Sequence, residues 1–420
     1  MIGIAERVRV SRLPNGVEAY LLENHTNSTV DVVGYIDGGM FLEDPGLSGV
    51  AQLCTSMLDR GTKHRDHGAI ADALESNGAR LGYGLRAEVV TFRARCLSED
   101  LAMLIEILGD TLAFPAFPED QLRLVIEDAK AGLREIAYDT YTRAYRRGTS
   151  LLLGPAHPYA REPLGREDVL EVLSSTDLHA YHERAVAAGS RMRLAVVGDI
   201  DVAATETLLV NNLGAIPRGD VNVDYRAGEL ARETRGRDHV AVRDKEQIDV
   251  VFLLPGIART SDRFTAGSLA NFLLGGSFVS RLNQQLRDQE GLTYGAQSVI
   301  TSGLHSGLWS AYVGVHPQNL ERAVEGTRRE VRRLASEGAG EEELQLAREH
   351  LTGSFPIRLE TNRVVGAVLL EGIRSGKGLD FIDRYTERVR SVTLDDVNAA
   401  ARELWLSGEP VVVTAGTGGA

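Results

Sequence analysis

The segment His179-x-x-His182-Glu183 gathers two imidazoles and a carboxylate on one stretch of chain. Imidazole nitrogens and carboxylate oxygens are ligands that zinc uses in proteins, and a helix brings all three within reach of one ion. The two histidines are at i and i+3, however, which makes the set a weak zinc motif. We therefore expect no metal at this segment.

Three other patterns that could carry chemistry are weaker still. His64 and His67 belong to the polar run KHRDH at 63–67, and we expect both side chains to be solvated. The run Gly275-Gly276-Ser277 lacks the Gly-Lys-Ser/Thr ending and the preceding strand of a phosphate-binding loop. No Gly-x-Ser-x-Gly sequence occurs. The phosphate-loop NTPases and the serine hydrolases with that motif are excluded.

One helix in the first half has clear periodicity. Its apolar residues recur at i, i+3, i+4 and i+7 and form a single stripe made of Leu47, Val50, Ala51, Cys54, Met57 and Leu58. The opposite stripe is then Gln52, Thr55, Ser56 and Asp59. We expect the helix to end at Gly61-Thr62.

A second helix, in the other half, spans Ser280 to Glu290, with Leu282 and Leu286 facing inward. Gly291 is a typical C-terminal stop, and alternation from Leu292 through Tyr294 to Ala296 then predicts a strand. From these residues alone, Arg287 is a cation near a helix C-terminus and Tyr294 a half-buried strand residue.

Strand-like runs alternate with long amphipathic helices along the whole chain, which indicates an α+β protein. SerGluAspLeu at 98–101 is echoed by ProGlnAsnLeu at 317–320, and LeuGlyTyrGly at 81–84 by LeuThrTyrGly at 292–295. The sequence therefore predicts two homologous halves, each a mostly antiparallel sheet with helices on one face. We expect a first half at 1–213, a linker rich in Pro, Gly and charge at 214–237, and a second half at 238–420.

The composition of the chain argues against several classes of binding partner. The chain has 420 residues and a net charge of −13, with no long basic run, which argues against nucleic acid or an anionic membrane as partner. Cys54 and Cys96 are the only cysteines, so we expect them to be small buried residues rather than metal ligands. The start of the chain has no signal-peptide pattern, which predicts a cytoplasmic protein, or a periplasmic one if a leader was trimmed.

The segment Gly46 to Thr62 (GLSGVAQLCTSMLDRGT) resembles the part of the pitrilysin and mitochondrial processing peptidase family that carries an inverted His-x-x-Glu-His zinc motif. Aligning on Met57 and Gly61-Thr62 puts the two histidines at Gln52 and Ser56 and the general-base glutamate at Thr55. An amide and two hydroxyls supply neither the zinc affinity nor the base. The family's third ligand maps to Glu135 and a supporting acid to Asp128, which we interpret as relics or salt-bridge partners. We expect no metal or other cofactor in this chain.

The resemblance covers nearly the whole chain. Its further landmarks are HisProTyr at 157–159, LeuGly at 164–165, LeuAlaValValGlyAspIleAsp at 194–201, LeuProGlyIle at 254–257 and LeuGlyGlySerPheValSerArgLeu at 274–282. Arg287 and Tyr294 match the family's LeuArg-x-x-x-Gly-Leu-x-Tyr pattern, whose Arg and Tyr contact the substrate backbone. The resemblance implies that Tyr294 stabilises the oxyanion, that Arg287 anchors the peptide, and that Gly275 and Gly276 help to guide it.

The resemblance implies the zinc-less subunit of a heterodimeric metalloendopeptidase. The zinc would belong to a homologous partner, and the substrates would be peptides or unfolded segments. The alternative is a non-catalytic scaffold resembling the core subunits of the respiratory cytochrome bc complex. An independent protease built on His179, His182 and Glu183 is a third, poorly supported, possibility.

Overall fold

The computed structural model describes residues 3–220, 222–225 and 236–417. The chain forms two compact units, each made of three stretches: Met1–Leu133, Glu162–Asp224 and Ile357–Asp383 for the first unit, and Arg134–Arg161, Tyr225–Pro356 and Arg384–Ala420 for the second. The switch from Asp224 to Tyr225 falls within the predicted linker at 214–237. Residues 221 and 226–235 of that linker lie outside the described part of the chain.

The first unit is built on a six-stranded sheet. In spatial order its strands are β1 (Arg9–Arg12), β2 (Glu18–Glu23), β6 (Met192–Gly198), β3 (Thr29–Asp37), β5 (Val89–Leu97) and β4 (Arg80–Leu85). Only β2 and β6 run parallel, and all other neighbours are antiparallel. On β5, Val90, Phe92, Ala94 and Cys96 are buried as predicted.

The second unit repeats this topology. The order of its strands is β7 (Arg237–Ala241), β11 (Val411–Gly416), β8 (Ile248–Pro255), β10 (Gly307–Val315) and β9 (Ala296–Ser302). The single parallel pair, β7 with β11, occupies the place of β2 with β6. The other pairs are antiparallel. The prediction of two homologous α+β halves with mostly antiparallel sheets is therefore confirmed.

Helices cover both faces of each sheet. In the first unit these include α2 (Val50–Met57), α3 (His67–Ser76), α4 (Leu101–Ala113), α5 (Glu119–Tyr138, whose last residues belong to the second unit), α8 (Ser175–Tyr181), α9 (Val202–Leu213) and α14 (Asn362–Arg374). In the second unit they include α6 (Thr140–Leu153), α10 (Phe264–Asn271), α12 (Leu320–Glu337), α13 (Glu341–Arg358), α15 (Phe381–Ser391) and α16 (Leu394–Trp405).

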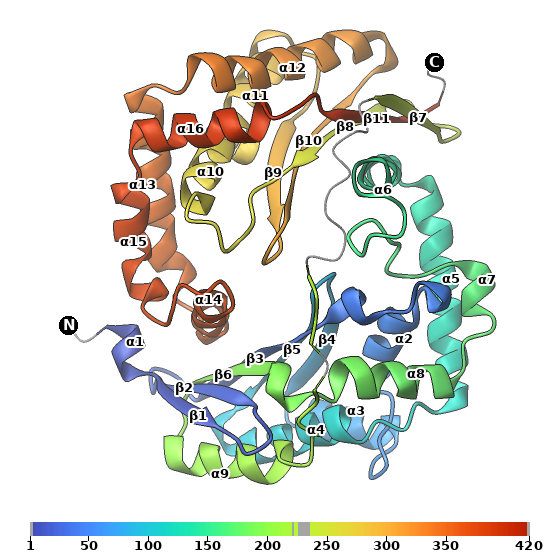
Figure 1. The fold of residues 1–420 in the computed structure, drawn as a ribbon. Coiled ribbons are helices and arrows are strands. Elements are labelled where there is room, and N and C mark those ends of the chain that lie inside the picture. Colours follow the sequence, from blue (N-terminus) through green and yellow to red (C-terminus); the bar gives the residue numbers. More distant parts are fainter. Residues whose placement is uncertain (1–2, 221, 226–235, 418–420) are drawn as a thin grey trace. The chain divides into compact units, whose positions relative to one another are not determined.

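The expectation of helices on one face only is wrong, because each half of the sequence contributes one helix to the other unit. Helix α6 packs on β8 and β11, and α14 packs on β3 and β6 (Figure 1). Glycines allow both approaches: a Cβ at Gly148 would lie 2.1 Å from Leu253 Cδ1, and one at Gly366 would lie 2.8 Å from Val33 Cγ2. With both faces covered, the central strands are buried along nearly their whole length.

Candidate functional site

Helix α2 is fixed at its N-terminus by a buried carboxylate and a close glycine contact. Glu43 Oε2 accepts hydrogen bonds from the backbone N–H groups of Gly49 (3.2 Å) and Ala51 (3.1 Å). Gly49 has φ +102°, and a Cβ there would lie 2.9 Å from the Cα of Gly165. The Leu164-Gly165 landmark thus has a packing role. The predicted apolar stripe is buried, apart from the half-buried Leu47. The helix itself is shorter than predicted: Leu47 lies before it in a 3-10 turn, and it ends at Met57 rather than at Gly61-Thr62.

The three polar positions of α2 bond within their own helix. Gln52 Nε2 donates to Ser56 Oγ at 2.9 Å, and both side chains are half-buried. Thr55 differs from the expectation of a polar outer stripe: it is 1% exposed, and its hydroxyl donates to the Ala51 carbonyl at 2.7 Å. That bond lets a hydroxyl be buried without an unsatisfied donor. These side chains do not fit a zinc ion.

The remaining acids and histidines do not form a ligand set either. Glu135 and Asp128 on α5 are exposed, and neither makes an ion pair within the described residues. No cluster of three or more His, Cys, Asp or Glu side chains in the described ranges could hold a metal ion.

His182 is instead a core residue. Its Nε2 lies 2.9 Å from the Leu112 carbonyl oxygen, and the Phe117 ring packs edge-on against it and against His179. Burial lowers the pKa of His182 to about 4, so the ring is neutral. Glu183, the third member of the sequence pattern, is exposed.

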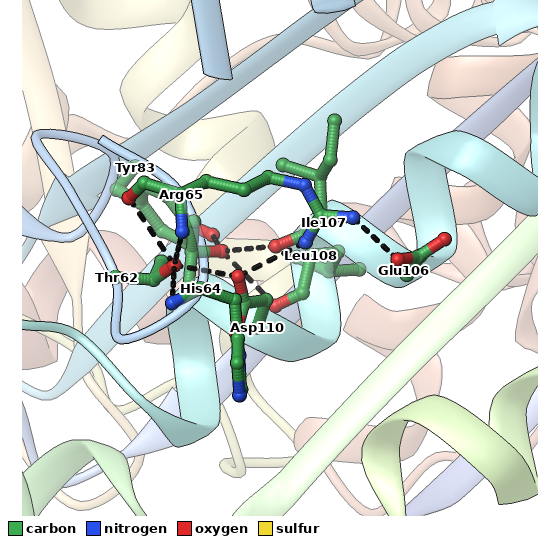
Figure 2. A network of polar contacts seen from close by, with 9 residues as sticks. Thr62, His64, Arg65, Tyr83, Glu106, Ile107, Leu108 and Asp110 are labelled. Carbon is green, nitrogen blue, oxygen red and sulfur yellow. Dashed lines mark hydrogen bonds and ion pairs between the residues drawn. The ribbon is translucent and has the colours of Figure 1, made fainter. Parts of the chain in front are cut away.

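The His64 side chain is 59% exposed, as expected, and its ring also contacts a buried acid. Figure 2 shows that the segment after α2 folds around the buried Asp110 of α4. Asp110 accepts from the Thr62 hydroxyl at 2.6 Å, contacts His64 Nδ1 at 2.5 Å and pairs with Arg65 at 3.1 Å. His67 Nδ1 lies 3.2 Å from the Asp59 carbonyl oxygen. These histidines hold the turn that follows α2.

In the second unit, the structure brings three of the predicted site residues to one cavity. Tyr294, Gly275 and Gly276 line a hollow of about 550 Å³ together with Phe278. Tyr294 is 90% exposed, not half-buried, because β9 begins only at Ala296 and the predicted strand starts too early. Gly275 is buried, and a Cβ there would lie 2.6 Å from the backbone nitrogen of Ser298, so close packing alone requires glycine at this position.

The backbone around Tyr294 is held in place although its side chain is free. The Thr293 hydroxyl donates to the Gly314 carbonyl at 2.7 Å and accepts from the Gly295 N–H at 3.2 Å. Asn283 Oδ1 accepts from the Ala296 N–H at 3.0 Å, and Asn283 Nδ2 donates to the Ser277 carbonyl at 3.1 Å. The tyrosine therefore projects from a fixed base.

Arg287 lies on the π-helical turn η7 (Gln284–Gln289), where Leu286, like Leu282 just before the turn, is fully buried as predicted. Its guanidinium carbon is 4.1 Å from the centre of the Phe278 ring, and its closest ion-pair contact is Asp288 at 3.9 Å. Phe278 thus connects Arg287 to the cavity that Tyr294 lines. Gly291, with φ +60°, ends the helical segment as expected.

Sequence reasoning missed Phe278, Asn283 and Thr293. Asn283 carries a weak signal, since it is a buried polar residue next to the inward Leu282. No helix among the described residues is long and apolar enough to cross a membrane.

Comparisons with known proteins cover both halves. Residues 19–151 match the model of the insulinase family (peptidase family M16), and residues 173–351 match that of the peptidase M16 inactive domain. An uncharacterized zinc protease of Streptomyces coelicolor is 26% identical, over 94% of this chain and 87% of its own length. The beta subunit of the mitochondrial-processing peptidase of Blastocladiella emersonii is 25% identical, over 98% and 89%.

A solved structure extends the match to the whole fold. The peptidase M16 inactive domain from Pseudomonas fluorescens superposes with a TM-score of 0.90 at 23% identity, covering 98% of both chains. This superposition shows that the fold is shared, and the two family models, one in each half of the sequence, give the assignment. The chain belongs to peptidase family M16.

Proposed function

We propose that this chain is the zinc-less subunit of a heterodimeric metalloendopeptidase, and that it supplies Tyr294 and Arg287 to a homologous subunit that bears the zinc motif. The observation that carries the proposal is the contrast between the two predicted sites. The zinc positions Gln52, Thr55 and Ser56 are engaged within their own helix, whereas Tyr294 stands 90% exposed on a fixed loop beside a cavity.

Tyr294 suits the stabilisation of developing negative charge. Its hydroxyl has no hydrogen-bond partner among the described residues, and the bonds made by Thr293 and Asn283 fix the backbone that carries it. A fixed donor aimed at an oxyanion lowers the barrier because the donor need not reorganise during the reaction. We propose that Tyr294 donates to the carbonyl oxygen of the scissile peptide bond.

Arg287 suits the binding of the peptide itself. Stacking on Phe278 orients its guanidinium, and that group makes no close ion pair that would have to break. A planar fork of donors can bind carbonyl oxygens or a terminal carboxylate with two bonds. We propose that Arg287 anchors the substrate while Gly275 and Gly276 leave room for its backbone.

The surroundings favour an extended peptide as substrate. Strand β9 is the last strand of its sheet, and its residues Gln297, Val299 and Thr301 are exposed. We propose that its outer edge pairs with an added strand. Phe278, which lines the cavity with Tyr294, is 67% exposed, and its neighbour Val279 is 69% exposed, so an apolar side chain of a peptide could contact them. That one relative is named as a subunit supports the proposal of a partner.

The test is an activity assay on an extended fluorogenic peptide, with this chain alone, a zinc-motif homologue from the same genome alone, and both together. We expect cleavage only by the pair. Tyr294→Phe should lower turnover by on the order of 10²-fold, and Arg287→Ala should act partly on KM. Arg287→Lys should restore little of the activity lost in Arg287→Ala, because lysine lacks the planar guanidinium group.

Tyr83→Phe is the matched control, since Tyr83 is the tyrosine of the similar LeuGlyTyrGly pattern in the first unit; the pair carrying it should cleave at the wild-type rate. Every variant pair must elute as a dimer before its rate is interpreted. If pairs with Tyr294→Phe and Arg287→Ala assemble and cleave at wild-type rates, the Arg/Tyr assignment is wrong. A pair that assembles but never cleaves would support a scaffold instead.

A further inference from the structure

A cavity of about 430 Å³ lies in the first unit and shares no lining residue with the cavity beside Tyr294. Helix α14 forms one wall, and strands β3 and β5, with the turn that precedes β5, form the rest. The charged residues of its lining are four arginines and one glutamate: Arg86, Arg93, Arg363, Arg374 and Glu371. The whole chain has a net charge of −13, so this excess of cations is a local feature.

Three of these arginines make no ion pair within the described residues. They are Arg86, Arg93 and Arg363, and all three are exposed, so a ligand can reach them directly. Arg363 lies near enough to act on the buried Asp31 carboxylate, but the ion-pair partner of that carboxylate is Arg95, at 3.9 Å. An arginine binds a carboxylate with two parallel N–H···O bonds, so each of the three can take one acidic group.

The fourth arginine, Arg374, is already paired. It contacts Asp37 at 3.1 Å and Glu88 at 2.8 Å, two acids that do not line the cavity. Glu371, half-buried on α14, is the carboxylate of the lining. Three unpaired arginines therefore stand against one glutamate, and the exposed part of the lining is positively charged.

The sheet is open beside these cations. In the register of β4 with β5, Gly82 lies opposite Arg93, and Gly84 lies opposite Thr91. Residues directly opposite each other carry their side chains on the same face, so the edge strand β4 presents only backbone at these two positions. A Cβ at Gly82 would meet no atom within 4 Å. The face next to Arg93 thus has room for an added chain.

We propose that this cavity binds an acidic segment of an extended peptide. Its Asp or Glu side chains would pair with Arg86, Arg93 and Arg363, and its backbone would lie over the two glycines of β4. The three cations come from a turn, a strand and a helix, so several carboxylates along one chain match them better than a single small anion does. The binding needs no zinc-bearing partner, so it can fail while the proposed function holds.

The direct test measures peptide binding to the full chain alone by fluorescence anisotropy. The probe is the peptide ETETETET with an uncharged label, and the controls are QTQTQTQT and KTKTKTKT with the same label. In about 50 mM salt we expect saturable binding of ETETETET, and binding of both controls at least about tenfold weaker, because several exposed ion pairs add up. In about 0.5 M salt the binding should be lost, because salt screens exposed charges.

Variants locate the site. The double variant Arg93→Gln/Arg363→Gln should weaken ETETETET binding by on the order of tenfold, and each single variant by about two- to fivefold. Arg123→Gln/Arg218→Gln is the matched control: both residues are exposed, make no ion pair within the described residues and do not line the cavity. It changes the net charge equally, and the affinity should stay within about twofold.

Gly82→Val tests whether the peptide lies over β4. The added side chain enters open space on a strand, where valine is well tolerated, so the chain should fold and the peptide should be obstructed. We expect binding of ETETETET to weaken several-fold although no charge changes. Unchanged affinity in this variant would contradict the placement over β4.

Circular dichroism and thermal melting establish that each variant is folded, and the single arginine variants take the place of the double one if it is not. Equal affinity for ETETETET and QTQTQTQT overturns the proposal, and so does an equal loss of affinity in the two double variants. Inorganic phosphate is added as a competitor at constant ionic strength. If it binds as tightly as ETETETET and displaces it, the cavity is a small-anion site and the peptide proposal is wrong.

Discussion

Two tyrosines from the similar patterns LeuGlyTyrGly at 81–84 and LeuThrTyrGly at 292–295 have opposite surroundings. Tyr83 lies on the edge strand β4 of the first sheet, half-buried, with its hydroxyl 2.5 Å from Thr111 Oγ1 on α4. Burial raises its pKa far above the usual tyrosine range. Tyr294 lies just before the edge strand β9 of the second sheet and is 90% exposed. The same fold thus contains one tyrosine that is hydrogen-bonded and half-buried and one that is exposed.

The same contrast extends to the helices beside them. On α2 the polar groups bond within the helix, as Gln52 does to Ser56 and Thr55 to Ala51. In the second unit the internal bonds are made by Asn283 and Thr293, while Arg287 stacks on Phe278 without a close ion pair and Tyr294 stays exposed. Repetition of topology therefore does not repeat the polar contacts, and the two units leave different side chains available for binding.

The largest effect is expected from Thr55→Glu, which places at this buried position of the first unit the acid that the family motif has there. The carboxyl group would enter a place that is 1% exposed. Burial without a counter-ion should cost about 3–5 kcal/mol of unfolding free energy, measured by urea denaturation. Thr55→Val, of equal size, should cost about 1 kcal/mol or less. If Thr55→Glu and the wild-type chain were equally stable, the side chain at position 55 would have to be accessible to water.

Acid should weaken the first unit through His182. The folded pKa of about 4 lies below the ordinary histidine pKa of 6.5, so the unfolded chain takes up the proton first as the pH falls. The contribution to stability is complete above pH 6.5 and is lost between 6.5 and 4, by about 3 kcal/mol in all. His182→Gln should flatten this dependence in urea denaturation at a series of pH values. If the unfolding free energy of the variant fell with pH as steeply as that of the wild type, the acid sensitivity would come from other groups.

A pair of Tyr→Phe variants compares the two units directly. Tyr83→Phe removes the bond to Thr111 and should lower the unfolding free energy by about 1 kcal/mol. Tyr294→Phe removes a hydroxyl without a partner and should change stability by less than about 0.5 kcal/mol. Thermal and urea unfolding of the isolated chain measure both. If Tyr294→Phe lost more unfolding free energy than Tyr83→Phe, Tyr294 and not Tyr83 would be the tyrosine with a structural role.

The smallest effects are expected at Gln52 and Ser56, the positions that we aligned with the family's zinc-binding histidines. Gln52→Ala and Ser56→Ala each remove one hydrogen bond between half-buried side chains and should cost about 0.5 kcal/mol or less. Elemental analysis should find no stoichiometric zinc in the purified chain, and the same in both variants. One zinc per wild-type chain, lost in the variants, would mean that these positions still bind metal.

Local patterns in the sequence determined much of this protein. The apolar stripe of α2, the alternation on β5, the inward Leu282 and Leu286 and the stop at Gly291 follow from helix and strand periods and from glycine's freedom at positive φ. The repeat of the halves also appears in the sequence, because equivalent helices and turns keep similar residues. These features depend on neighbours within a few positions.

Only the tertiary structure decided which polar groups are satisfied. The exchange of α6 and α14, the pairing of His64 with Asp110 and the covering of Thr55 join residues far apart in the chain or depend on what packs above a helix. The exposure of Tyr294 and the absence of an ion pair at Arg93 within the described residues are of the same kind. A residue's type gives its bonding capacity, but its surroundings determine whether that capacity is used.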